Sequence, residues 1–230
     1  MLAGHIGAGL AIGRIERRVN VGVFIAAALL LDMALWLFIL LGWESVSIPV
    51  DFIHTHQAQF VFPWSHGLPA GLAWSAAAAA AAFIGCAHLG KDRMRAAALI
   101  GVAVFSHWLI DALVHVPELP LAGAASPKVG LGLWQSMPWA LALEAAIVVA
   151  GLLLFLPGSA LPRGRKLWLA GLALLMLVFT ILGMTVAPAP PSAIAMAGTS
   201  LPTLVVICAL AHRFGRLRQA GRPDTMAAPS

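Results

Sequence analysis

The sequence predicts an all-α fold: a polytopic membrane helical bundle of about six transmembrane helices with a short N-terminal half-helix. Two observations support this prediction. First, 61% of the 230 residues are hydrophobic and only 10% are charged, whereas a soluble domain carries roughly 25% charged residues. Second, the basic residues form short clusters that separate apolar runs long enough to cross a bilayer, which takes about 20 residues. We therefore expect an integral membrane protein whose main partner is the lipid bilayer.

Six apolar runs qualify as membrane spans, and they cover residues 20–43, 67–89, 96–116, 132–156, 167–187 and 193–212. Residues 2–13 are also apolar but too short to span, so they either lie at the interface or enter the bilayer as a half-helix. Residues 1–214 then form a single membrane-embedded helical domain. The polar residues 215–230 form a tail for which we expect disorder.

The basic clusters predict the orientation of the chain in the membrane. They hold 13 of the 14 lysines and arginines, at residues 14–18, 91–95, 163–166 and 213–222. Six spans place all four clusters on one side, and the positive-inside rule makes that side cytoplasmic. We therefore expect a multi-pass protein of the bacterial cytoplasmic (inner) membrane with both termini in the cytoplasm. The pI near 10.2 is then a topology signal, and no nucleic-acid partner is expected.

The third apolar run ends in a stripe of ionisable residues. His107, Asp111 and His115 follow one another at intervals of four residues, so they share one face of a helix that Pro117 ends. Their neighbours are mainly Leu, Ile, Val and Trp, and burying an unpaired charge in such surroundings is expensive. The stripe therefore needs a partner, which a metal ion, a charged substrate or a proton would supply. A purely structural hydrogen-bonded pair is the alternative.

Two further carboxylates, those of Asp32 and Glu144, fall inside predicted spans. Ionisable residues in a membrane are costly and mark functional sites by default, although each could also simply join two helices. At about 1.5 Å per residue, these two residues, His107 and Asp111 lie near the midplane or in the outer half of the bilayer. Their shared depth favours one common site.

Two more histidines have candidate positions at this depth. His66 stands at the outer end of the second span. His5 reaches the level of Asp32 only if residues 1–13 pack as a hairpin against the first span; an interfacial helix would instead place it among lipid headgroups.

A set of histidines and carboxylates from several helices suits Zn²⁺, or Mn²⁺ as the second choice. The cysteines, Cys86 and Cys208, lie in separate apolar runs and form no metal-binding pair. A metal in such a site makes bound water a nucleophile near neutral pH. A spare carboxylate would act as general base, and Asp32 and Glu144 are our catalytic candidates.

Several short motifs occur in a recognisable order over residues 1–120. They are Ala-Gly-His-Ile-Gly-Ala around His5, Leu-Leu-Leu-Asp ending at Asp32, Trp-Ser-His ending at His66, and Ser-His-x-x-x-Asp from Ser106 to Asp111. In these motifs the chain resembles the YdjM-like family of membrane-bound metal-dependent hydrolases, which is related by motif to zinc phospholipase-like hydrolases. The resemblance implies a divalent metal, and it implies as its ligands His5, Asp32, His66, His107 and Asp111.

The leading functional expectation is a membrane-bound metal-dependent hydrolase that acts on a lipid or phosphoester, with its His/Asp site near the outer half of the bilayer. One alternative is a transporter or permease that uses the intramembrane Asp, His and Glu residues as a proton or cation relay. Another is a non-catalytic membrane scaffold with a structural metal.

Overall fold

The computed structural model describes residues 1–216, which are almost entirely helical. The helices in chain order are α1 (Leu2–Gly13), α2 (Val21–Ala28), α3 (Leu30–Leu40), α4 (Phe52–Thr55), α5 (Leu68–Gly85), α6 (Arg93–Val114), α7 (Met137–Phe155), α8 (Arg163–Thr185) and α9 (Ala193–Gly215), with two 3-10 turns, η1 (Ala87–Asp92) and η2 (Leu133–Ser136). Two short antiparallel pairs complete the fold: β1 (Ser45–Ser47) with β2 (Gln59–Val61), and β3 (Leu119–Pro120) with β4 (Lys128–Val129). The predicted all-α bundle is confirmed.

The helices α5 to α9 are each long and apolar enough to cross a membrane, and α2 and α3 together make a sixth, broken span. The six predicted runs therefore correspond to six spans. The first differs from expectation, because it is bent by 48° between Ala28 and Leu30 instead of running straight. The predicted tail lies, from residue 217 onwards, outside the residues that the structure describes.

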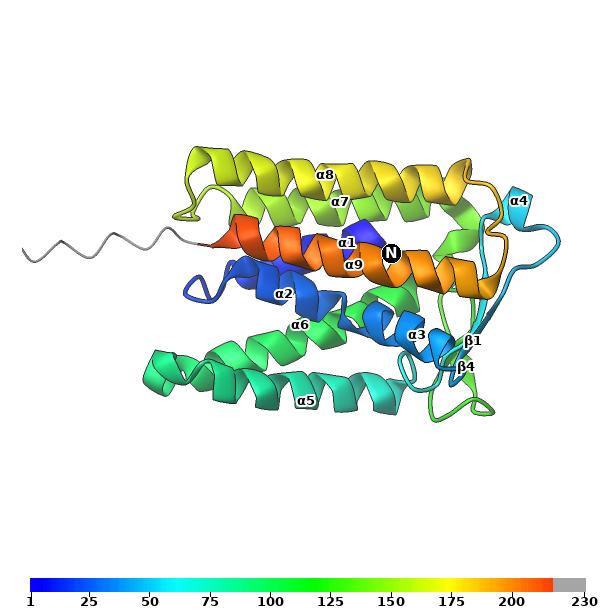
Figure 1. Cartoon of the computed structure of the whole chain (residues 1–230), viewed down its shortest axis with the longest axis horizontal. Helices are drawn as coiled ribbons and strands as arrows, with labels where there is room; N and C mark the ends of the chain where they lie inside the picture. The colour runs from blue at the N-terminus through cyan, green and yellow to red at the C-terminus, as the bar shows by residue number, and fades with distance from the viewer. Residues whose placement is uncertain (217–230) are drawn as a thin grey trace, which may run out of the picture.

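The helices are arranged in three groups (Figure 1). The α5–α6 hairpin lies on one side and the α7–α8 hairpin on the other, with α1, α2, α3 and α9 between them. The α1–α2 loop, η1, the α7–α8 loop and the end of α9 carry the basic clusters as far as residue 216, and they lie at one end of the bundle, at the left of Figure 1, whereas the strands and α4 lie at the other. We call these the basic end and the strand end.

The half-helix α1 lies inside the bundle, packed against α7 and α2. Glycines permit this close approach: a Cβ atom on Gly7 would stand 2.5 Å from the carbonyl oxygen of Ile147, and one on Gly9 would stand 2.8 Å from the Cα atom of Ile25. Of the two placements expected for residues 2–13, the structure therefore has the inserted one. His5 is fully buried as a result.

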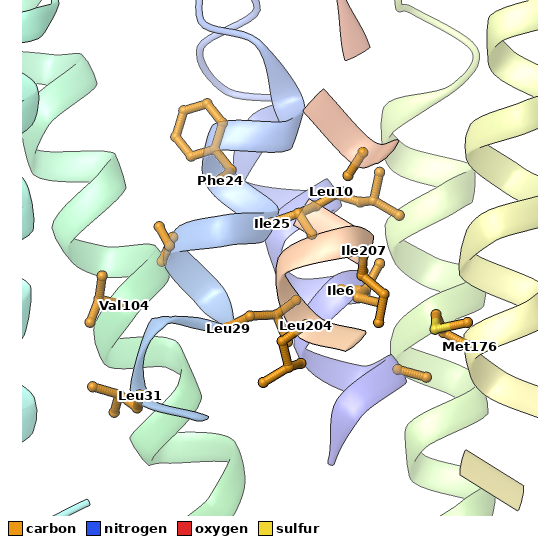
Figure 2. Packing of buried hydrophobic residues seen from close by; sticks show 14 of the residues in the cluster. Ile6, Leu10, Phe24, Ile25, Leu29, Leu31, Val104, Met176, Leu204 and Ile207 are labelled. Atoms are coloured by element: carbon orange, nitrogen blue, oxygen red, sulfur yellow. The ribbon is translucent and has the colours of Figure 1, made fainter. Parts of the chain in front are cut away.

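Apolar side chains from both halves of the sequence pack around α1. Figure 2 shows Ile6 and Leu10 of α1 in one cluster with Ile25 of α2 and with Leu204 and Ile207 of α9. This packing holds α1 beside α2 and fixes the position of α1 along the long axis of the bundle. The cluster thus positions His5 relative to the first span.

A side chain from α6 contacts the backbone at the break in the first span. Residues 26–30 contain neither proline nor glycine. Instead, the carbonyl oxygen of Ala28 accepts a hydrogen bond of 2.7 Å from Nδ1 of His107, and a side chain inserted into the helical ladder is a recognised cause of a kink. The break also places Asp32 in the first turn of α3, where the helix dipole stabilises a negative charge.

Candidate metal centre

The structure brings together all five residues predicted as ligands. His5 comes from α1, Asp32 from α3, His66 from the turn before α5, and His107 and Asp111 from α6. They form two overlapping groups, one of His5, Asp32 and His107 and one of His66, His107 and Asp111, and in each group the ligand atoms lie within 4.8 Å of one another. Elements far apart in the sequence therefore share one buried His/Asp group that could hold a metal ion.

Asp111 lies at the centre of this group. Its Oδ2 atom is 3.1 Å from Nε2 of His107 and 3.4 Å from Nε2 of His66, and its Oδ1 atom is 3.2 Å from Nε2 of His5. Oδ1 of Asp32 lies 3.6 Å from Nε2 of His107 and 3.8 Å from Nε2 of His66. Ligand atoms around a tetrahedral zinc ion stand about 3.3–3.6 Å apart. The observed spacing is therefore close to that of a coordination sphere.

The tautomer of His107 follows from its partner. Nδ1 faces the carbonyl oxygen of Ala28 at 2.7 Å, and a carbonyl only accepts, so Nδ1 carries the proton. In the neutral ring Nε2 is then an unprotonated acceptor that points at Asp111. This is the form in which imidazole binds metals.

A hydrogen-bonded chain orients His66 in the same way. Ser65 Oγ donates to Glu44 Oε2 at 2.7 Å and lies 2.8 Å from Nδ1 of His66, so it accepts the Nδ1 proton. Glu44 Oε1 also accepts from the backbone N–H groups of Trp64 and Ser65. Burial raises the pKa of Glu44, and the hydrogen bonds from Ser65 and Trp64 oppose that rise. Outer-shell chains of this kind fix the orientation of metal-binding histidines.

When both rings are neutral, two unprotonated nitrogens face each other, because Nε2 of His66 lies 3.1 Å from Nε2 of His107. Two lone pairs at that distance repel unless a positive charge lies between them. Nε2 of His5 and Oδ1 of Asp111 lie 3.2 Å apart but form no hydrogen bond of acceptable geometry, and Nδ1 of His5 is also buried without a hydrogen-bond partner; burying such groups without hydrogen bonds is costly. A shared divalent cation would satisfy the facing nitrogens, Oδ1 of Asp111 and one nitrogen of His5, because a single ion binds only one nitrogen of an imidazole ring.

His115 and Glu118 form a second pair beside the group, and Glu118 was missed in the sequence. His115 Nδ1 lies 2.6 Å from Glu118 Oε1, and His115 Nε2 lies 3.7 Å from Oδ2 of Asp111. The backbone N–H of Phe60 donates to Glu118 Oε2. The sequence pattern that could have indicated this pair is the His-x-x-Glu spacing. Because Pro117 ends the helix between the two residues, helical periodicity did not predict their contact.

Glu144 has a different contact from the one expected of a base. Its Oε1 atom accepts from the backbone N–H groups of Ala3 at 2.9 Å and Gly4 at 3.1 Å, the first free donors of α1. Among the described residues it belongs to neither potential ligand group. Glu144 thus fixes the start of the helix that carries His5. A catalytic role for it stays a prediction.

A cavity of about 300 Å³ adjoins the group, and its polar side is formed by Asp32, His66, Asp111 and His115. The side chain of Asp32 is 21% exposed, whereas that of Asp111 is 2% exposed. Asp32 is therefore the carboxylate that a molecule in this cavity can reach.

No family model, curated protein or solved structure matches this chain. The resemblance of residues 1–120 to the YdjM-like family therefore stays a prediction that depends on the short motifs around His5, Asp32, His66 and His107.

Proposed function

We propose that this protein is a metal-dependent hydrolase of the bacterial cytoplasmic membrane that acts on a lipid or phosphoester. The observation that carries the proposal is the pair of facing acceptor nitrogens of His66 and His107, 3.1 Å apart and in contact with the buried carboxylate of Asp111. A cation is the simplest partner for such an arrangement. The resemblance to the YdjM-like family agrees with this proposal.

In this proposal His66, His107 and Asp111 hold the ion, and Asp32 and His5 complete the site from the other side. Zinc is the first choice because imidazole nitrogens suit it, and manganese is the second. The ion supplies Lewis acidity and an activated water near neutral pH. Asp32 faces the cavity, so its carboxylate is placed to take a proton from the attacking water. His115, oriented by Glu118, lines the same cavity.

A transporter or permease is the second candidate, and the broken first span favours it. Discontinuous helices whose ends meet at a polar site are typical of secondary transporters. Here α2 ends at the Ala28 carbonyl and α3 begins beside Asp32. A scaffold with a structural metal is the third candidate.

Metal analysis of the purified full-length protein separates these candidates. We expect about one zinc ion per chain. We also expect the protein to hydrolyse the lipids in vesicles of phosphatidylethanolamine and phosphatidylglycerol. A chelator should stop this hydrolysis, and added zinc should restore it. Asp32→Asn should slow this hydrolysis. Protein without zinc or manganese would favour the transporter, and metal-loaded protein without hydrolysis of lipids or phosphoesters would favour the scaffold.

The proposed orientation places the basic end in the cytoplasm and the strand end outside. In a variant without Cys86 and Cys208, we expect an impermeant thiol reagent to label Ala124→Cys in intact cells and to leave Gly164→Cys unlabelled. Both positions are exposed, at opposite ends of the bundle. The reverse labelling pattern would contradict this orientation.

A further inference from the structure

The cavity beside the His/Asp group continues into an apolar region. An enzyme that acts on a water-soluble molecule would have no use for such a region. Beyond its polar side, the walls include Leu35, Trp36, Phe60, Phe62 and Leu204. Leu35 is 4% and Trp36 is 9% exposed, so both lie inside the bundle. The cavity therefore joins a polar centre to an apolar slot.

The slot reaches the outer surface of the bundle between α8 and α9. Phe179 of α8 lines it and is 56% exposed, and Thr199 and Thr203 of α9 line it and are exposed as well. Phe179 lies six residues before the end of α8 and Thr199 six residues after the start of α9, which is about 9 Å from the strand end of each helix. The opening is thus level on both helices, within the hydrocarbon depth of a bilayer about 30 Å thick.

The threonines at this opening have no free hydrogen-bond donor to offer a ligand. Thr199 Oγ1 donates to the carbonyl oxygen of Ala195 at 2.9 Å, and Thr203 Oγ1 donates to that of Thr199 at 2.7 Å. Both hydroxyl protons are thus used within α9, and the exposed ring of Phe179 makes much of the opening apolar. A polar, water-soluble substrate would have to leave water to enter it, at a large cost.

We propose that the cavity holds one hydrocarbon chain of a membrane lipid, which enters sideways from the bilayer between α8 and α9. The chain passes Phe179 and Thr203 and lies against Leu35, Trp36 and Leu204. Its polar linkage then lies beside Asp32 and His66. On this path most of the side chains that the hydrocarbon chain contacts are apolar. That the lipid is a substrate rests on the proposed function, whereas its binding does not.

Photo-crosslinking tests this placement directly. The full-length protein is reconstituted in phosphatidylethanolamine vesicles that contain a phosphatidylethanolamine with a diazirine in the middle of one acyl chain, and the labelled residues are mapped by mass spectrometry. Exposed residues such as Leu153, which is 68% exposed, should be labelled whether or not a lipid chain enters the cavity. Leu35 and Trp36 are reached only through the cavity, so their labelling reports a chain inside it.

Ser200→Phe fills the cavity, because Ser200 lines it and is only half-buried. We expect this variant to lower labelling of Leu35 and Trp36 at least tenfold and to leave labelling of Leu153 unchanged. Val206→Phe adds the same ring at a position of α9 that is 56% exposed. This control variant should leave the labelling of Leu35 and Trp36 and that of Leu153 unchanged. Thr203→Trp, at the opening, is a second blocking variant should Ser200→Phe fail to fold.

Absence of label on Leu35 and Trp36 in the wild-type protein would overturn the proposal, and so would unchanged label in both blocking variants. Metal content is measured on the same samples. Wild-type protein that binds zinc without cavity labelling would refute the lipid slot and leave the proposed hydrolase standing. Cavity labelling in protein that binds no metal would support the slot and refute the hydrolase.

Discussion

Nε2 of His66 and Nε2 of His107 lie 3.1 Å apart, and the Nδ1 proton of each ring is donated elsewhere, to Ser65 and to Ala28. In the neutral rings, each Nε2 therefore presents a lone pair to the other. Asp111 Oδ2 lies within 3.4 Å of both. This relationship between two rings from different elements is the strongest indication of a cation site in the described part of the chain.

Removal of a ligand should release the metal. We expect His107→Ala and Asp111→Ala each to lose bound zinc and to melt at a lower temperature, because the remaining buried charges are left uncompensated. Elemental analysis and thermal unfolding measure the two effects. His212→Ala is the control, since that residue lies in the last turn of α9 at the basic end, and it should change neither. Full zinc occupancy in either ligand variant would contradict the site.

Ser65→Ala should weaken zinc binding without abolishing it. The substitution removes the acceptor of the His66 Nδ1 proton and breaks the link to Glu44. Loss of an outer-shell partner typically costs roughly 10–100-fold in metal affinity. Competition with a chromophoric chelator gives the affinity. Ser126→Ala, in the loop between β3 and β4, serves as the control and should bind zinc as the wild type does.

Glu144→Leu should be more damaging than Glu144→Gln. The amide oxygen of glutamine can still accept from the N–H groups of Ala3 and Gly4, whereas leucine leaves both donors without a partner, at a cost of about 1–3 kcal/mol each. The two variants are compared by thermal unfolding and by their rates of lipid hydrolysis in the phosphatidylethanolamine and phosphatidylglycerol vesicles. Equal loss of hydrolysis in both variants, with normal stability for Glu144→Gln, would instead assign a base or ligand role to the carboxylate.

The loop between α1 and α2 should confer stability that depends on pH. Arg18 donates to Glu16 at 2.7 and 2.8 Å and to Asp92 at 2.7 Å, and its hydrogen bond lowers the pKa of Glu16 below the usual 4.5. The stabilisation is therefore complete above about pH 4.5 and is lost as the pH falls through the lowered pKa.

Thermal unfolding between pH 3 and pH 7 measures this effect against Arg18→Met, which keeps most of the side-chain length. Because the side chain of Arg18 is 48% exposed, solvent screens its ion pairs and the difference in stability at pH 7 should be small. It should shrink towards zero at pH 3. A difference that stays constant over this range would show that Glu16 contributes nothing through its charge.

The sequence by itself determined the number and approximate limits of the spans and the shared face of His107 and Asp111. Span length depends on bilayer thickness, and residues four apart in a helix meet whatever surrounds them. These are properties of consecutive residues. For residues 2–13, which are too short to span, the sequence left two placements open; the inserted one depends on the close approach of Gly7 to Ile147 and of Gly9 to Ile25.

Only the tertiary structure decided how the site is assembled. No proline or glycine near Leu29 predicts the break in the first span. The side chain that binds the Ala28 carbonyl there, His107, lies 79 residues away in the sequence. Glu144 caps a helix 140 residues away, a contact that no periodicity encodes. The protonated nitrogen of each histidine is likewise set by an acceptor on another element. These features arise from packing between distant helices, which local spacing does not specify.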